Sequence, residues 1–355
     1  MTHIQHRLTE VRRLLEEKNL PALLVMQAEN RRYLSGFTGS AGMLLITPTQ
    51  AILSTDFRYW EQGAKQAPGF TLHQAAGGYK DFLPGLIAAG GKPARVGIES
   101  FTVTLAQYEQ MQKVVPDVEW VGVNGLIENV RAVKDADELA LTQKTIDLAE
   151  EGLRYLLTLL KPGMTEKQAA WDLEVYLRSH GADALSFDTI VAAGPNAALP
   201  HHHPSERVIQ ANEPITIDWG AAIDGYRSDL TRTIVLGEPD AKFREIYGIV
   251  LKAQLNAIGQ IKAGQTGREA DAFARDVIVA AGYGDYFGHG LGHGVGLAVH
   301  EQPRASFTVE DERLPTNSLL TVEPGIYLPG WGGVRIEDMV LVQEQGVEVL
   351  SHFEK

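Results

Sequence analysis

The stretch Thr216-Ile-Asp-Trp-Gly-Ala-Ala-Ile-Asp-Gly-Tyr-Arg-Ser-Asp-Leu-Thr231 carries a clear structural signal. Its Asp224-Gly225 dipeptide is a strong β-hairpin turn signal. With these two residues as the loop, Asp229 faces Gly220, which shares a strand face with Asp218 because side chains alternate along a strand. The two carboxylates then point into one region, where they repel each other unless a cation lies between them. A bulge in either strand would change this parity. The alternative is a hairpin exposed to solvent, but the apolar residues that flank both acids argue against a solvated hairpin.

A second hairpin is predicted for Thr321-Val-Glu-Pro-Gly-Ile-Tyr-Leu-Pro-Gly-Trp-Gly-Gly-Val-Arg-Ile-Glu337. A turn centred on Gly330 puts Glu323 directly opposite Glu337. Like charges in opposite positions destabilise a hairpin. A metal ion bridging the two carboxylates removes that objection.

Six of the eleven histidines occur in two short stretches, 201–203 and 289–300. Between Gly288 and Gly296 every even position is glycine, which makes a helix there very costly and argues against a helical zinc site. The same spacing excludes a dinucleotide-binding fingerprint. A loop or strand with a bare backbone remains, and imidazoles on such a backbone suit a ligand or catalytic role. Two polar loops without a function are the alternative.

These stretches together supply a set of oxygen-rich candidate metal ligands with one imidazole: Asp218, Asp229, His293, Glu323 and Glu337. Such a set suits two Mn²⁺, Co²⁺, Fe²⁺ or Zn²⁺ ions. A calcium loop would hold its ligands within about a dozen residues, whereas these are spread over the chain. Two such ions roughly 3.5–4 Å apart can activate a water against an amide or a phosphate. The sequence therefore predicts a two-metal hydrolytic site.

Composition narrows the class of protein. At 355 residues two domains are expected, and 44% hydrophobic with 22% charged residues is typical of a globular protein. The net charge of −13 without a basic block argues against nucleic-acid binding. No apolar run approaches the roughly 18 residues that a membrane span needs. The absence of cysteine excludes disulfides, thiolate zinc sites and cysteine nucleophiles, and together with the lack of a signal-peptide pattern it favours a cytoplasmic location.

The chain divides by pattern near residue 130. Residues 1–20 predict an amphipathic helix, and the first third alternates further helices with short apolar strands, as in an α/β domain. The strands are expected at 22–26, 43–47 and 51–55, and the helices at 7–18 and 104–115. Beyond the boundary, helices are expected at 135–160, 165–180, 242–263 and 267–281, with strands and tight turns from residue 186 onward.

Residues from about 130 to 350 resemble the "pita-bread" metallopeptidases, which include methionine aminopeptidase, aminopeptidase P and prolidase. The motifs that carry the resemblance occur in order: Leu199-Pro200-His201, the Asp218/Asp229 hairpin, Gly292-His293-Gly294-Val295-Gly296, His300-Glu301, Thr321-Val322-Glu323-Pro324-Gly325 and Arg335-Ile336-Glu337-Asp338. The resemblance implies an α/β N-terminal domain, residues 1–130, followed by an α+β pita-bread catalytic domain, residues 131–355.

The N-terminal third resembles the smaller domain of the proline-specific branch of this family. The stretches Arg32–Ser40 and Thr55–Tyr59 are similar to those of aminopeptidase P relatives. The resemblance therefore implies an Xaa-Pro aminopeptidase, which removes the first residue from peptides with proline in second position. It also implies a homodimer in which the N-terminal domain of one chain helps to wall the partner's site.

Transferred motif by motif, the resemblance implies a role for each ligand. Asp218 would chelate one metal ion, His293 and Glu323 the other, and Asp229 and Glu337 would bridge both. Mn²⁺ is the expected metal, with Co²⁺, Zn²⁺ or Fe²⁺ as alternatives. A water activated by the two cations would attack the scissile carbonyl.

The resemblance implies further roles around the metals. Glu323 would also carry a proton to the leaving proline nitrogen, His289 and His300 would stabilise the oxyanion, and His201 would belong to the proline pocket. Three residues are expected to bind substrate or support the site: Tyr327, Arg335 and Arg304. Tyr327 and Arg335 share strand faces with Glu323 and Glu337 by period two, although a plain ion pair is the alternative for Arg335. Arg304 occupies the position where prolidases hold a free carboxylate.

Three other functions compete with an aminopeptidase. A prolidase performs the same chemistry on Xaa-Pro dipeptides alone. Non-catalytic proteins of this fold bind histones or RNA, and creatinase-like enzymes use the fold without metal. The intact set of five ligands opposes the last two alternatives, and the acidic charge opposes RNA binding.

Overall fold

The computed structural model describes residues 3–355, so the first two residues of the predicted N-terminal helix lie outside the described part. The chain forms two compact units, one ending at Arg131 and the other running from Ala132 to Lys355. None of the described helices is both long enough and apolar enough to cross a membrane.

The first unit is built on one six-stranded mixed sheet with the strand order β4-β3-β2-β1-β5-β6. The strands are β1 (Leu23–Val25), β2 (Met43–Ile46), β3 (Ala51–Thr55), β4 (Thr71–Gln74), β5 (Arg95–Glu99) and β6 (Glu119–Val123). The helices are α1 (His3–Glu17), α2 (Ala28–Ser35), α3 (Trp60–Gln66), α4 (Tyr79–Ala89), α5 (Leu105–Val114) and α6 (Leu126–Ala132). The central strands β1 and β2 are buried along their whole length, which explains their continuous apolar runs. The predicted α/β fold of this unit is confirmed.

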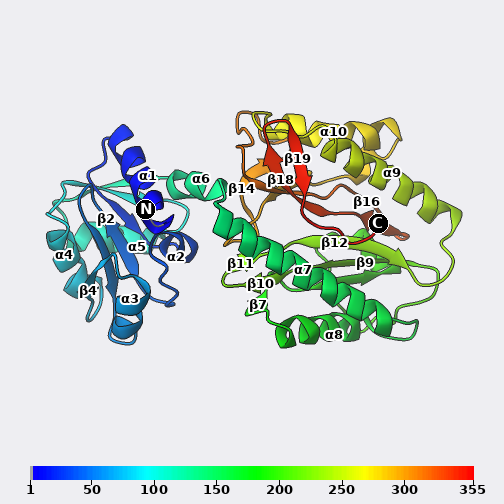
Figure 1. Cartoon of the computed structure of the whole chain (residues 1–355), viewed down its shortest axis with the longest axis horizontal. Coiled ribbons are helices and arrows are strands. Elements are labelled where there is room, and N and C mark those ends of the chain that lie inside the picture. The colour runs from blue at the N-terminus through cyan, green and yellow to red at the C-terminus, as the bar shows by residue number, and fades with distance from the viewer. Residues whose placement is uncertain (1–2) are drawn as a thin grey trace. The chain divides into compact units, whose positions relative to one another are not determined.

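The second unit places short strands between two pairs of helices (Figure 1). Its helices are α7 (Ala136–Leu159), α8 (Glu166–Ser179), α9 (Ala241–Ile258), α10 (Gly267–Ala280) and the 3₁₀ turns η1 (Gly194–Ala198) and η2 (Gly284–Tyr286). Its strands are β7 (Ala184–Leu185), β8 (Ile190–Ala193), β9 (Pro214–Trp219), β10 (Ala221–Ile223), β11 (Tyr226–Arg227), β12 (Leu230–Val235), β13 (Gly292–Gly294), β14 (Glu301–Ala305), β15 (Leu319–Val322), β16 (Gly325–Leu328), β17 (Gly332–Arg335), β18 (Asp338–Gln343) and β19 (Gly346–Val349).

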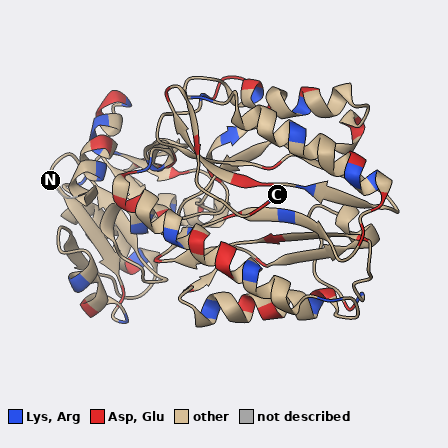
Figure 2. Ribbon diagram, turned by 45° about the vertical axis from the view of Figure 1, so that its right-hand side comes forward, with Lys and Arg blue, Asp and Glu red and all other residues tan. Residues whose placement is uncertain are grey.

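Two apolar clusters hold these layers together. One joins α7 and α8 to β8, β9 and β12 and includes the fully buried Ile217 and Trp219. The other joins α9 and α10 to β15, β16 and β18 and includes Val250 and Ile326. The outer helices carry interspersed positive and negative side chains, while Asp and Glu also occur on the enclosed strands (Figure 2). Acidic residues between two apolar layers need a local compensation for their charge.

The helix boundaries follow from local capping. Asp135, Thr165 and Thr266 are the N-caps of α7, α8 and α10, and each forms a capping box with an acid or amide three residues later. The helices predicted at 135–160, 165–180 and 267–281 are thus confirmed. The helix predicted at 242–263 ends earlier, at Ile258, because Gly259 takes the C-cap position and carries no side chain to continue the packing.

Candidate metal centre

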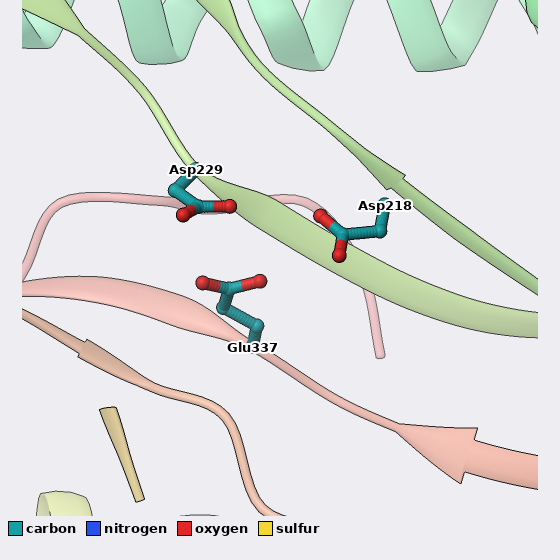
Figure 3. A group of neighbouring side chains, drawn as sticks. All are labelled: Asp218, Asp229 and Glu337. Carbon is teal, nitrogen blue, oxygen red and sulfur yellow. The ribbon is translucent and has the colours of Figure 1, made fainter. Parts of the chain in front are cut away.

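Three acidic side chains of the second unit converge between the helix layers. Asp218 lies in β9, Asp229 directly precedes β12, and Glu337 directly precedes β18 (Figure 3). Each offers a carboxylate oxygen, and these oxygens all lie within 4.8 Å of one another. Asp229 and Glu337 are buried, with 5% and 1% of their surface exposed. Such close, buried carboxylates form a cage that suits a divalent cation.

The first predicted hairpin has the predicted register. Asp224 and Gly225 both have positive φ, at 48° and 76°, as a two-residue type I′ loop requires. The pairs Ile223–Tyr226 and Asp218–Thr231 belong to one continuous numbering of partners, so no bulge changes the parity. The ladder is interrupted at Gly220 and Asp229, because β9 ends at Trp219 and β12 begins at Leu230. The two backbones still approach closely there, since a Cβ on Gly220 would lie 1.9 Å from the Ser228 carbonyl oxygen. The acid therefore lies at a break between two strands.

The second hairpin has the same property. Gly330 has a φ of 80° and centres the turn, and the register of β16 with β17 continues into that of β15 with β18. Glu323 and Glu337 fall in the gap between these two ladders. Their amides pair elsewhere: the Glu323 N–H donates to the Leu291 carbonyl, and the Glu337 N–H donates to the Thr231 carbonyl. This last bond attaches the second hairpin to the first.

His293 and Glu323 complete the cluster from a third direction. The His293 Nε2 lies 3.3 Å from the Glu323 Oε1 and 3.6 Å from the Asp229 Oδ2. His293 is in β13, which is a strand as the glycine pattern allowed. A Cβ at Gly292 would lie 2.0 Å from the Thr321 carbonyl oxygen. The bare backbone thus admits the neighbouring strand β15, which brings the imidazole beside Glu323.

The electrostatics of the cluster call for a cation. Burial, followed by the charges of neighbouring acids, raises the pKa of Asp229 and of Glu337 well above their usual values. Within residues 3–355, the Asp218 Oδ1 and the Glu337 Oε1 are buried without a hydrogen-bond partner. A buried acceptor left unpaired costs about 1–3 kcal/mol, and more when it is charged. Two inward-facing free oxygens beside a carboxylate and an imidazole fit divalent metal ions.

A hydrogen-bonded chain runs along one side of the cluster. The His289 Nε2 lies 2.8 Å from the Tyr327 hydroxyl, which accepts a bond from Arg335 at 2.9 Å. Arg335 also donates to the Asp218 Oδ2 at 2.7 Å and to the Thr231 hydroxyl. Tyr327 and Arg335 are therefore brought to the site. Arg335 also forms an ion pair, which is the alternative role predicted for it from the sequence. Its partner in that pair, Asp218, is itself a candidate metal ligand.

The remaining histidines lie around the cluster. The His293 and His300 rings are 4.2 Å apart between centroids, in a near-perpendicular arrangement. The charge of the exposed His201 acts on both His289 and His300, although burial is the main cause that lowers the pKa of these two rings. A neutral imidazole at His300 can donate a hydrogen bond to a developing negative oxygen. The His289 Nδ1 lies 2.8 Å from the Gly290 carbonyl oxygen, so the neutral His289 ring donates there and its Nε2 accepts from the Tyr327 hydroxyl.

Arg304 is placed differently from the other predicted residues. It pairs with His293 in the β13–β14 ladder, so both side chains leave the same face of the sheet. Its side chain is 59% exposed, and its guanidinium lies 3.7 Å from the Glu312 carboxylate. Arg304 thus flanks the cluster without contacting it.

The comparisons with known proteins agree with this architecture. The profile of Metallopeptidase family M24 matches residues 140–344, and that of the Creatinase/Prolidase N-terminal domain matches residues 7–133. The first match covers more than half of the chain. The chain belongs to metallopeptidase family M24.

Individual M24 relatives resemble the chain along its whole length. An Xaa-Pro dipeptidase from Bacillus anthracis is 41% identical with a TM-score of 0.96, over 99% of this chain and 98% of that one. An X-Pro aminopeptidase from Thermotoga maritima is 38% identical with a TM-score of 0.88, over 97% and 98% of the two chains. An Xaa-Pro dipeptidase of Pyrococcus horikoshii is 34% identical over 100% and 99% of the two chains. The expected pita-bread fold is confirmed, and the branch is that of M24 peptidases acting on Xaa-Pro substrates.

Sequence reasoning missed several residues of this M24 site. The Thr231 hydroxyl donates to the Glu337 Oε2 at 2.7 Å, and the Thr321 hydroxyl donates to the Glu323 Oε1 at 3.0 Å. Each threonine lies two residues from a candidate ligand, so period two along the strands could have found them. Asp271 and Arg275 of α10 are bound to the backbone at Leu291 and at His289, respectively. No local pattern marks those two, because their partners lie in a distant loop.

Proposed function

We propose that this site hydrolyses the peptide bond before proline with two divalent ions held by the five predicted ligands: Asp218, Asp229, His293, Glu323 and Glu337. The observation that carries the proposal is the pair of buried, unpaired oxygens on Asp218 and Glu337 beside the His293–Glu323 pair. When bound, the two ions supply a lowered pKa of a water and polarisation of the scissile carbonyl. The chemistry of the donor set and membership of a metallopeptidase family support divalent ions, and Mn²⁺ is the ion that we propose.

The surrounding side chains supply the proton transfers and hydrogen bonds. Burial alone would raise the pKa of Glu323, but the hydrogen bond and charge of His293 bring this pKa to about 2. A charged Glu323 accepts the proton of the attacking water and delivers it to the proline nitrogen as the bond breaks. His300 donates to the oxyanion, and His289 does so in the tautomer that carries its proton on Nε2, the nitrogen that the Tyr327 hydroxyl otherwise binds. His201 contacts the proline ring of the substrate.

Arg304 favours Xaa-Pro dipeptides as the preferred length. A dipeptide presents a free carboxylate next to its proline, and a substrate held beside His293 brings that carboxylate toward the face that Arg304 shares. Arginine binds a carboxylate in a bidentate, charge-assisted manner. The dipeptidases of B. anthracis and P. horikoshii support the same choice.

Aminopeptidase activity on longer peptides is the second candidate. The Arg32–Ser40 and Thr55–Tyr59 stretches favour it, as does the similarity to the X-Pro aminopeptidase of T. maritima. A homodimer belongs to the proposal in either case, and sedimentation at micromolar concentration tests it.

One assay separates these functions. The protein is stripped of metal, reloaded with Mn²⁺ or Co²⁺, and offered Xaa-Pro, Xaa-Pro-Yaa and Met-Ala-Yaa peptides. We expect metal-dependent cleavage of Xaa-Pro dipeptides first. Preferential tripeptide cleavage moves the chain to the aminopeptidases, and cleavage of Met-Ala-Yaa alone overturns the proline assignment.

The role of Arg304 is tested by Arg304→Ala, with Arg268→Ala as a matched control on an exposed arginine. We expect Arg304→Ala to raise KM for Xaa-Pro about 10–100-fold, because a charge-assisted bond contributes about 1.5–3 kcal/mol. The carboxamide of the same dipeptide should show little change. Equal losses on both substrates contradict carboxylate recognition by Arg304.

A further inference from the structure

Glu166, the first residue of α8, is a buried acid that the catalytic scheme does not use. Its side chain is fully buried, with no exposed surface. It accepts hydrogen bonds from five donor groups at 2.7–3.2 Å, all in the segment 193–205: the Ala193 N–H, the Asn196 amide, the His202 Nε2, and the Ser205 N–H and hydroxyl. One carboxylate thus ties together both ends of a segment of more than ten residues.

That segment presents His201. Asn196 precedes His201 by five residues and His202 follows it directly, so the donors flank the site residue on both sides. The His202 N–H also donates to the Leu199 carbonyl and closes the turn that carries His201. Within the described residues no hydrogen bond holds the His201 ring, which is exposed. The placement of the His201 ring therefore depends on the segment.

The opposite side of the segment is fixed by glycines of β17. A Cβ at Gly333 would lie 2.2 Å from the Ala197 carbonyl oxygen, and one at Gly332 would lie 2.9 Å from the Gly194 carbonyl oxygen. The 3₁₀ turn η1 thus packs directly on the strand that carries Arg335. On the α8 side, the Lys167 N–H donates to the Ser205 carbonyl, so the segment also caps the helix.

The hydrogen bonds to Glu166 are charge-assisted, because their acceptor is an ionised carboxylate. Burial alone would raise its pKa, but the bonds from Ser205 and Ala193 outweigh burial and lower it. The carboxylate is therefore charged at neutral pH, and charge-assisted hydrogen bonds are roughly twice as strong as neutral ones.

We propose that Glu166 is a positioning residue, which anchors the segment 193–205 between α8 and β17 and thereby positions His201. This inference rests on the proposed function, because the role of His201 is recognition of the proline ring.

The test is a double-mutant cycle of Glu166→Gln with His201→Ala, assayed as the Mn²⁺-loaded enzyme on an Xaa-Pro dipeptide. The Glu166→Gln change would introduce an NH₂ group into a cluster of donors. Because a 1 Å misplacement can cost on the order of 10²-fold, we expect Glu166→Gln to lower kcat/KM by about that factor, mainly through KM. Metal content should stay that of the wild type. Glu174→Gln is the control, since Glu174 is on the same helix and pairs with the exposed Arg178.

The cycle distinguishes positioning from a general structural role. If Glu166 acts through His201, the double variant is no worse than His201→Ala. Multiplying effects, or near-wild-type kinetics of Glu166→Gln, overturn the proposal. If Glu166→Gln does not fold, His202→Ala is the substitute, because it removes a single donor to Glu166. We expect a smaller loss of kcat/KM from His202→Ala, and no further loss when it is combined with His201→Ala. A loss of kcat/KM that persists in the His201→Ala background overturns the proposal.

Hydrogen exchange supplies a readout that needs no substrate. We expect faster amide exchange across residues 194–205 in Glu166→Gln and unchanged exchange in α9 and α10. Unchanged exchange in the segment contradicts the anchoring role. If the wild type cleaves no Xaa-Pro peptide, the proposed function fails, while the exchange result still decides whether Glu166 orders the segment.

Discussion

Buried carboxylates differ in how far their oxygens are hydrogen-bonded, and Glu99 of the first unit contrasts in this respect with Asp218 and Glu337 of the second. In the first unit, Glu99 accepts hydrogen bonds from the Met26 and Gln27 amides on one oxygen and from Asn30 on the other. In the second unit Glu166 is likewise saturated, but Asp218 and Glu337 each keep one buried oxygen that has no partner among residues 3–355. A saturated acid holds a fold together, whereas an unsaturated acid costs stability unless a ligand completes it. The difference marks where the chemistry of the molecule lies.

The largest expected effect that sharpens this comparison is the loss of a bridging acid. Glu337→Ala should reduce turnover to that of the metal-stripped protein, because both ions lose a ligand at once. Peptide hydrolysis and the metal content per chain are the measurements, with the exposed Glu344→Ala as a control. Asp229→Ala should behave in the same way as Glu337→Ala. If either variant keeps two ions per chain and near-wild-type turnover, the assignment of Asp229 and Glu337 as metal ligands is contradicted.

The second effect concerns the imidazoles that touch the cluster from outside. His289→Ala and His300→Ala should keep their metal but lose about 10²–10³ in kcat, as is common when one oxyanion donor is removed. The neighbouring exposed His203→Ala serves as the control. Metal loss with normal turnover per bound ion would show that the roles are reversed.

The third effect concerns thermal stability, which the acidic cluster should lower without metal and raise with metal bound. Saturating Mn²⁺ at about 100 times its Kd should stabilise the wild type by about 2.7 kcal/mol, or roughly 5–10 °C in the midpoint of thermal unfolding. Glu337→Gln should abolish this gain. In chelator the same variant should melt above the wild type, since burial and then the neighbouring acids raise the pKa of Glu337 and make its ionised form unfavourable at neutral pH. A variant that melts below the wild type in chelator contradicts the unsatisfied cluster.

The smallest effect tests the saturated acid of the first unit. Glu99→Gln places an amide group among donors and should destabilise the protein by about 1–3 kcal/mol, equally with metal and with chelator. Denaturant unfolding measures this change, with Glu109→Gln, on an exposed position of α5, as the matched control. If the destabilisation by Glu99→Gln depends on Mn²⁺, the contrast between Glu99 and the acids of the cluster is contradicted.

Local chemistry predicted much of the second unit. The positive φ at Asp224, Gly225 and Gly330 fixes both hairpin turns, and period-two alternation then fixes which acids share a face. The capping residues likewise fixed the starts of α7, α8 and α10. The premature end of α9 was the exception, because a glycine within an apolar period gives a weak stop signal when sequence alone is considered.

By itself the sequence determined the turns, the register of each hairpin and the types of the candidate ligands, because these depend on residues close together along the chain. Only the tertiary structure decided how the pieces meet. The Glu337 N–H donates to the Thr231 carbonyl. His293 reaches Glu323 because Gly292 lets the two strands approach closely. Glu166 accepts hydrogen bonds from the segment that carries His201. Each of these contacts joins segments that are far apart in sequence. Such contacts form only when apolar layers on both sides exclude water and fix the strands between them, and no local pattern encodes that placement.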